Sequence, residues 1–392
     1  MRRHLPAVLA TATSLTLLAA GQVASAADLS SGSSLPRLSS GSSLPGTTAP
    51  DLSESFVVTE HGSFNEGWAM SFLPGTHYLA VTERAGAIRL YDTETDEVTE
   101  VTGVPEVYDV GKAGLFDLIP GPTFDTDGTV YLSWARPHAQ GSQGVVATAR
   151  LDTQTASLSD VDVIWEQAPS TGDGHFSLRL LIQGDHLFVT SGERQKGAPA
   201  QSMATNLGKI LRLTLDGEPA EGNPWYDRGG VAAEFYSMGH RNILGIAEGP
   251  GGSVWASEMG PRGGDELNLI EPGGNYGWPK VSMGDNYDGT PIPDHAAGDG
   301  FRAPKAYWDP SISPANLAIY QGTLFPGWQG SALLGGLSGQ TLVRVPIAGE
   351  DTGTPESWDA GARIREVEVA PDGAVWILED GADGRLRELR PQ

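Results

Sequence analysis

The 392-residue sequence contains no cysteine, which excludes disulfide bonds, thiolate metal sites and a cysteine nucleophile. Basic residues are scarce, because 25 Lys and Arg face 49 Asp and Glu and leave a formal net charge of -24. Such a negative chain repels nucleic acid and anionic lipid, so we expect neither as a partner. A dinucleotide-binding glycine motif and a serine nucleophile elbow are also missing, so neither NAD chemistry nor a serine hydrolase is indicated.

The first residues have the pattern of a secretory signal peptide. Arg2 and Arg3 precede an apolar stretch over residues 5–20, and small residues end at Ala26. The apolar stretch is interrupted by Thr and Ser and is shorter than the roughly 20 residues that span a bilayer. We therefore predict a signal peptide over residues 1–26, export to the periplasm or the medium, and no stable membrane insertion.

Two further divisions of the chain follow from composition. Residues 27–50 repeat the segment SSGSSLP and are rich in Ser, Gly and Pro, so they are predicted to be a flexible linker. Residues 51–392 form a single predicted domain, whose alternating pattern begins near Phe56.

The predicted domain is all-β, because short apolar and β-branched runs alternate with Gly, Pro, Asp and Asn, and long helical periodicity is missing. A loose unit recurs six times, with a Gly or Asp, an apolar-aromatic-apolar run, and then a small or acidic residue. The six copies are HYLAVTER around Tyr78, GTVYLSWAR around Tyr131, DHLFVTSGER around Phe188, GSVWASEMG around Trp255, SALLGGLSG around Leu333 and GAVWILEDG around Trp376. Six copies predict a six-bladed β-propeller. Their uneven spacing, roughly 40 to 80 residues, leaves a β-sandwich or a pair of sandwiches as the alternative.

Three polar segments could carry chemistry. Arg241 and Asn242 follow an apolar strand together, and an arginine fork there suits a carboxylate or an oxygen that gains charge. A salt bridge that pins the loop is the simpler explanation from the residues alone. His175 follows a Gly-rich turn and precedes a strand, so it becomes a candidate proton acceptor if partners accompany it, although loop histidines are more often bystanders.

The third segment runs from Gly260 to Ile270 and continues to Pro279. Its glycines free the backbone, and Asp265, Glu266 and main-chain oxygens are the hard ligands that calcium prefers. An acidic surface turn explains the same spacing equally well.

Together, these segments resemble a known family. GHRNILGIA, GPRGGDELNLIEPGGNYGWP, GHFSLRL followed by FVTSGER, and RIREVEVAPDG are similar, in this order, to the soluble PQQ-dependent aldose sugar dehydrogenases of the glucose/sorbosone dehydrogenase family. The resemblance covers Phe56 to Leu389. It implies a six-bladed propeller that carries pyrroloquinoline quinone (PQQ) and calcium, takes an aldose sugar as substrate, and passes electrons to an external acceptor whose identity the sequence does not give.

The resemblance also implies roles for individual residues. His175 would remove the proton of the anomeric hydroxyl while the C1 hydride passes to the quinone, giving the lactone. Arg241 would stabilise the charge on the quinone oxygen. The further implied cofactor residues are Asn242, Gly336, Leu337, Ser338, Arg363, Ile364 and Arg365, and the implied metal residues are Gly260, Pro261, Glu266 and Tyr276. The arginines agree with elementary chemistry, because PQQ is a tricarboxylate and arginine forks bind carboxylates at two points.

Two positions depart from the family pattern. Gly336-Leu337-Ser338 stands where relatives often carry a lysine that contacts the cofactor, so one cationic contact is missing. Lys112 stands where relatives often carry a glutamine near the substrate, so it either supplies that charge or alters sugar preference. Tyr287 matches a further substrate-side position.

Two other functions remain open from the sequence. A calcium-dependent lactonase would also use a propeller, but it would leave the paired arginines Arg363 and Arg365 unexplained. A binding propeller without catalysis is suggested by Ser338, whereas the presence of both His175 and Arg241 argues against it.

Overall fold

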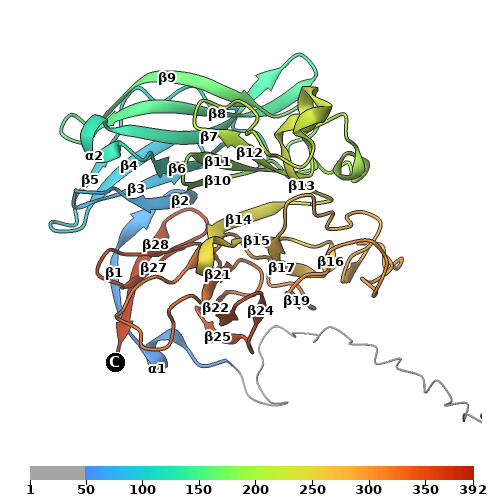
Figure 1. Cartoon of the computed structure of the whole chain (residues 1–392). Helices are drawn as coiled ribbons and strands as arrows, with labels where there is room; N and C mark the ends of the chain where they lie inside the picture. Colours follow the sequence, from blue (N-terminus) through green and yellow to red (C-terminus); the bar gives the residue numbers. More distant parts are fainter. Residues whose placement is uncertain (1–48) are drawn as a thin grey trace, which may run out of the picture. The chain divides into compact units, whose positions relative to one another are not determined.

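The computed structural model describes residues 49–392, so the predicted signal peptide and the predicted linker up to residue 48 lie outside the described residues. Six four-stranded antiparallel sheets follow one another along the chain. Their innermost strands contact one another in a closed sequence, β2 to β6, β10, β14, β20, β26 and back to β2. This arrangement is the predicted six-bladed propeller, and not a sandwich (Figure 1).

The four strands of each blade run in order from the innermost to the outermost. The first blade contains β2 (Gly67–Phe72), β3 (Tyr78–Glu83), β4 (Ala87–Asp92) and β5 (Val98–Glu100), and the second contains β6 (Leu115–Pro120), β7 (Thr129–His138), β8 (Gly141–Asp152) and β9 (Ser157–Glu166). The third contains β10 (Ser177–Gln183), β11 (His186–Ser191), β12 (Lys209–Thr214) and β13 (Phe235–Met238), and the fourth contains β14 (Ile243–Glu248), β15 (Val254–Glu258), β17 (Asp265–Ile270) and β19 (Ala306–Trp308). The fifth contains β20 (Ala318–Ile319), β21 (Ala332–Gly336), β22 (Thr341–Val345) and β25 (Glu356–Asp359), and the sixth contains β26 (Ile364–Val369), β27 (Val375–Glu379), β28 (Gly384–Pro391) and β1 (Phe56–Phe64).

The remaining elements are short. They are the ribbons β16 (Arg262–Gly263) with β18 (Gly284–Asp285) and β23 (Ile347–Ala348) with β24 (Asp351–Thr352), the helices α1 (Leu52–Ser55) and α2 (Phe124–Asp127), and the 3-10 turns Ala198–Gln201, Tyr226–Arg228, Gly230–Glu234 and Pro250–Gly252. Within residues 49–392, no helix has the length and apolar character needed to cross a membrane.

The six copies of the repeated unit are the second strands of the six blades: β3, β7, β11, β15, β21 and β27. A second strand has a neighbouring strand on both sides and a neighbouring blade on both faces, which explains its continuous apolar run. All five residues of β15, β21 and β27 are buried. The copies are unevenly spaced because insertions such as the β16–β18 ribbon lie between them.

The ring is closed by strands from opposite ends of the domain. β1 pairs with β28, with Phe56 opposite Pro391 and Phe64 opposite Gly384. Figure 1 shows β1 in blue beside β28 in red. Phe56 packs edge-on against Phe325, Trp328 and Trp358 of the fifth blade, so this strand is also fixed by an aromatic cluster.

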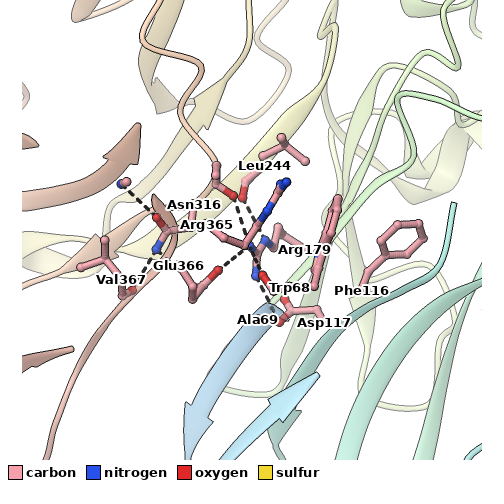
Figure 2. Close-up of polar contacts among 12 residues, drawn as sticks. Trp68, Ala69, Phe116, Asp117, Arg179, Leu244, Asn316, Arg365, Glu366 and Val367 are labelled. Atoms are coloured by element: carbon pink, nitrogen blue, oxygen red, sulfur yellow. Dashed lines mark hydrogen bonds and ion pairs between the residues drawn. The ribbon is translucent and has the colours of Figure 1, made fainter. Parts of the chain in front are cut away.

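One buried arginine occupies the axis of the ring. Arg179 of β10 is 4% exposed, and its guanidinium contacts the innermost part of each of the other blades (Figure 2). The contacts are Nε to Leu244 O (2.9 Å), Nη2 to Trp68 O (3.3 Å), Ala315 O (3.1 Å) and Glu366 Oε2 (2.5 Å), and Nη1 to Asp117 Oδ1 (3.6 Å). The axis is therefore filled by a polar network of buried side chains and main-chain oxygens.

Candidate active site

A cavity of about 410 Å³ lies at one end of the axis, where the loops that leave several blades meet. Trp68, Phe116 and Leu244 line it on the side nearest Arg179. Most of the predicted site residues line this single cavity, although they are far apart in the sequence. These are Lys112, His175, Arg241, Asn242, Gly260, Pro261, Tyr287, Leu337, Arg363 and Arg365.

His175 is held by a carboxylate. Its Nδ1 lies 2.5 Å from Oε1 of Glu193, and both side chains are buried, at 11% and 2% exposure. Burial lowers the pKa of His175, and the positive charges of Arg241 and Lys112 lower it further, while Glu193 opposes the shift. The imidazole is therefore neutral near pH 7. With Nδ1 facing Glu193, the proton sits on Nδ1 and leaves Nε2 able to accept one, and no hydrogen-bond partner for Nε2 occurs within residues 49–392.

Arg241 is fixed on several sides. Its Nη1 donates to Met259 O at 3.0 Å and its Nη2 to the Tyr287 hydroxyl at 3.1 Å, and its guanidinium stacks on Trp278 and Tyr287. Its Nε is buried and has no partner in the part of the chain that the structure describes. Asn242, next in sequence, accepts a hydrogen bond from Ser177 Oγ at 3.2 Å. The cavity thus contains a fixed cation that keeps one donor unused.

Arg363 and Arg365 share one carboxylate, Asp380. Nε of Arg363 lies 2.7 Å from Oδ2, and Nε and Nη2 of Arg365 lie 2.9 and 2.6 Å from Oδ1. Arg365 also stacks on the Trp68 ring at 4.4 Å. Burial raises the pKa of Asp380, but the two arginines outweigh it and hold that pKa below its ordinary value. Together with Asp380, the two arginines therefore carry one net positive charge in a fixed orientation.

The substrate-side residues lie at the rim. Lys112 is exposed, lines the cavity, and forms no ion pair within the described residues. Its backbone nitrogen donates to Asp173 O at 3.0 Å, in the turn that precedes His175. The nearby Arg84 is already paired with Glu66 and Asp109. Tyr287 is 74% exposed and follows the ribbon β16–β18.

The other predicted cofactor residues are placed differently. Leu337 lines the cavity, whereas Gly336 is buried at the end of β21. Ser338 is exposed, and its hydroxyl bonds Ser313 Oγ at 2.7 Å and Ser311 O at 3.2 Å. Ile364 is fully buried in the hydrophobic core of the last blades, so its side chain supports β26 and does not line the cavity.

Gly260 and Pro261 line the cavity beside Asp265. The Asp265 carboxylate accepts from Gly260 N at 2.9 Å and from Ser313 N at 2.7 Å, so it ties two loops together. Burial raises the pKa of Asp265 to about 6. Among the described residues, no group of three or more His, Asp or Glu side chains is arranged to hold a metal ion.

Glu266 and Tyr276 line a separate small cavity of about 10 Å³ next to Gly260. Glu266 lies directly opposite Glu258 on the neighbouring strand, and Asn268 Nδ2 donates to both carboxylates at 3.1 Å. Burial and the charge of Glu258 raise the pKa of Glu266 well above its ordinary value. Asn268 Oδ1 is buried and has no partner among the described residues. The Tyr276 hydroxyl donates to Leu269 O at 2.5 Å, so it is already in use.

Three carboxylates of the site were not among the predicted site residues. Glu193 follows β11 and supports His175, Asp380 follows β27 and pairs with Arg363 and Arg365, and Glu258 ends β15 and accepts from the Arg241 backbone nitrogen at 2.8 Å. Each is the acidic residue at the end of a copy of the repeated unit. The repeat itself was therefore the signal that could have found them.

The comparisons with known proteins agree with this geometry. Residues 64–388 match the family described as glucose/sorbosone dehydrogenase. The chain belongs to the glucose/sorbosone dehydrogenase family. The aldose sugar dehydrogenase YliI of Escherichia coli (strain K12) is 34% identical over 335 residues, which cover 83% of this chain and 90% of that protein.

Solved structures of family members share the fold. The soluble aldose sugar dehydrogenase of Escherichia coli in its apo form has a TM-score of 0.82 and 31% identity, and covers 86% of this chain and 100% of its own. The PQQ-bound aldose sugar dehydrogenase of Streptomyces coelicolor has a TM-score of 0.72 and 29% identity, covering 86% of this chain and 98% of its own.

Proposed function

We propose that this family member is an exported oxidoreductase that oxidises aldose sugars at C1 to the lactone, with PQQ and calcium as cofactors. The observation that carries the proposal is the cavity itself, where a neutral, oriented His175 lies with the cations Arg241, Arg363 and Arg365. Membership in the family and the PQQ-bound relative support it.

The residues of the cavity fit a multiply charged anion such as PQQ. Arg363 and Arg365 are oriented by Asp380, and Arg241 keeps its buried Nε without a partner among the described residues. A ligand carboxylate or carbonyl oxygen would satisfy that orphaned donor, and charge-assisted bonds to arginine are among the stronger hydrogen bonds. When bound, PQQ supplies the acceptor for the C1 hydride and its two electrons.

The small cavity fits a cation. Two buried carboxylates directly opposite each other repel. Asn268, whose amide contacts both, has a buried Oδ1 without a partner within residues 49–392. Glu266 with Glu258 would hold one calcium there, and Gly260 and Pro261 would contribute main-chain oxygens to another beside the cofactor. Calcium would supply positive charge that offsets the buried carboxylates.

Within this cavity, His175 Nε2 would accept the proton of the C1 hydroxyl. Glu193 holds Nδ1 and stabilises the imidazolium that forms, as the carboxylate does in a histidine–carboxylate pair of a hydrolase. Arg241 would stabilise negative charge that develops opposite the sugar. Lys112 and Tyr287 at the rim would contact the sugar, and the external electron acceptor would approach from the same open side.

The experiment is an absorbance titration of the apo-protein with PQQ, with and without calcium, followed by a panel of aldoses and an electron-accepting dye. We expect saturable PQQ binding that calcium strengthens, and then dye reduction that requires sugar. PQQ binding without dye reduction by any sugar would indicate a binding propeller. Calcium-dependent lactone hydrolysis without PQQ binding would indicate a lactonase, and either result would overturn the proposal.

A further inference from the structure

We infer that Arg194 is a positioning residue, which clamps the backbone of the loop Gly172–Phe176 so that His175 faces the cavity. The inference rests on the proposed role of His175 as the proton acceptor. It concerns a residue outside the cavity, since Arg194 is 1% exposed and does not line it.

The guanidinium of Arg194 reaches both sides of the turn that presents His175. Its Nη2 donates to Gly172 O at 2.6 Å and its Nε to Gly174 O at 3.1 Å. Two further contacts anchor the clamp to β8, where Nη1 donates to Ser142 O at 3.1 Å and Nη2 to Ser142 Oγ at 3.0 Å, and Nη1 also lies 3.5 Å from Gln167 Oε1. The guanidinium therefore joins the histidine loop to a strand of the preceding blade.

The backbone of the same segment completes the clamp. Arg194 N donates to His175 O at 3.3 Å, and Gly192 N donates to Phe176 O at 3.0 Å. A Cβ added at Gly192 would lie 2.2 Å from His175 O, so only glycine permits this approach. Three consecutive carbonyls of the loop, at Gly174, His175 and Phe176, are thus held by the segment from Gly192 to Arg194.

The loop and the start of β10 need such support because their backbone is strained. His175, Ser177 and Leu178 have φ of 50°, 62° and 66°, and Arg194 and Gln195 on the facing segment both have 58°. These are left-handed conformations that residues with a Cβ rarely adopt, and they persist only where surrounding contacts enforce them. Losing the clamp would allow the loop to relax toward ordinary conformations and turn His175 away from Glu193.

An arginine suits this position better than a lysine. Its planar group donates in several fixed directions at once, and its carbon centre lies 3.6 Å from the centroid of the Phe176 ring, next to His175. Arg194 forms no ion pair in the part of the chain that the structure describes, so carbonyl and hydroxyl oxygens and a side-chain amide compensate its charge. The buried charge is stable only while the loop keeps these oxygens in place, which couples Arg194 to the loop's conformation.

The adjacent Glu193 contacts the imidazole ring of His175. Glu193 Oε1 orients the imidazole, while Arg194 holds the main chain that carries it. The dipeptide Glu193-Arg194 therefore fixes His175 at two levels, the ring and the backbone. Because small displacements of a reacting group can cost about 10²-fold in rate, loss of the clamp should affect turnover more than cofactor binding.

The test compares Arg194→Met, which keeps an unbranched apolar side chain but removes the guanidinium, with Arg194→Lys, which keeps the charge but loses the planar donor group. Arg387→Met is the control, because Arg387 is also buried, donates to a main-chain carbonyl, Ala360 O, and does not line the cavity. Its ion-pair partner Glu379 keeps a second arginine, Arg385, in that variant. The first readout is ¹⁵N NMR of the histidine rings in the apo-protein, with the His175 signal assigned by His175→Gln. The second is turnover and PQQ affinity of the loaded protein.

We expect the wild-type signal to show one tautomer with the proton on Nδ1 and a pKa below 6.5. In Arg194→Met the tautomers should mix, the pKa should move toward its ordinary value, and kcat should fall about 10- to 100-fold with PQQ affinity changed less than about threefold. Arg194→Lys should give tautomer mixing and a kcat between those of the wild type and Arg194→Met. Arg387→Met should leave the His175 signal and kcat unchanged.

Unchanged His175 signals in both Arg194 variants would overturn the inference, as would equal changes in Arg387→Met. If Arg194→Met does not fold, the His175 tautomer and pKa in Arg194→Lys test the inference by the same criterion. Because the NMR measurement needs neither PQQ nor a sugar, it tests the clamp even if the dehydrogenase proposal fails. Failure of that proposal would instead appear as missing dye reduction in the wild-type protein.

Discussion

His175 and Glu193 form a buried pair in which Nδ1 of the imidazole lies 2.5 Å from a carboxylate oxygen. The carboxylate selects the tautomer and favours the imidazolium, so in the proposed reaction it would act on the proton transfer without contacting the sugar. The pair comes from two ends of one hairpin, since His175 precedes β10 and Glu193 follows β11.

Glu193→Gln should keep the shape of this pair and lose its charge. We expect kcat to fall by about 10²-fold or more, because the imidazolium loses its stabilising partner and the tautomer is no longer fixed. PQQ affinity should change little. Steady-state kinetics and a PQQ titration check this, and a kcat within twofold of the wild type would contradict it.

The pH dependence follows from the lowered pKa of His175. The imidazole must be neutral to accept a proton, so kcat/KM should rise with pH through a pKa below 6.5 and be level near pH 7. In Glu193→Gln the supporting carboxylate is gone, and the rise should move to still lower pH. A rise centred above pH 7 would show that another group controls the rate.

Arg363→Gln should weaken PQQ binding. The arginine is oriented by Asp380 toward the cavity, and losing a charge-assisted bond to a carboxylate typically costs about 1.5–3 kcal/mol, or roughly 10- to 150-fold in the dissociation constant. Arg390→Gln is the control, because that arginine also pairs with an aspartate but lies outside the cavity. Equal PQQ affinities of the two variants would exclude Arg363 from the cofactor site.

Arg179→Met should destabilise the whole ring. Removing the guanidinium leaves Asp117 and Glu366 buried without their common partner, which typically costs about 3–5 kcal/mol. Urea denaturation measures the loss in unfolding free energy. A loss below about 1 kcal/mol would mean that the carboxylates are compensated in another way.

Calcium should stabilise the fold through the pair Glu258 and Glu266. In calcium-free protein the raised pKa of Glu266 makes ionisation of this carboxyl unfavourable. The free energy of unfolding should therefore decrease as the pH rises above 4.5, the ordinary pKa of a glutamate. Glu266→Gln should therefore raise the melting temperature in a chelator at pH 8 and remove the increase that calcium gives to the wild type. An equal calcium response in both proteins would place the ion elsewhere.

The fold was predictable because each blade repeats one strand whose pattern is set by burial on both faces. Every copy of the unit, from Tyr78 to Trp376, proved to be a second strand, and the loops between copies caused only the uneven spacing. The arginines that the motifs singled out, Arg241, Arg363 and Arg365, line one cavity, and their roles there stay a prediction. Where Ile364 stands, however, the pattern predicted a cofactor contact and the structure places its side chain in the core.

The supporting residues were harder to find for a physical reason. Arg179 and Arg194 are buried charges whose partners lie elsewhere in the sequence. Arg179 pairs with the carboxylates of Asp117 and Glu366 and donates to Leu244 O, and Arg194 donates to Gly172 O. Main-chain oxygens such as these leave no trace in a sequence pattern. Within an apolar strand, Arg179 looks like an interruption. Only the closed ring brings its partners together.

The pairing of β1 with β28 also fixes the order in which the blades of the protein can fold. β1 precedes the other blade strands along the chain and β28 follows them, so the sixth blade cannot form until synthesis has reached its last strand. Until then β1 and the free edge of β27 each carry unpaired backbone groups, which is the usual template for misassembly between chains. The proposed export in an extended state would meet this requirement, because both ends of the domain would be available before the sixth blade forms.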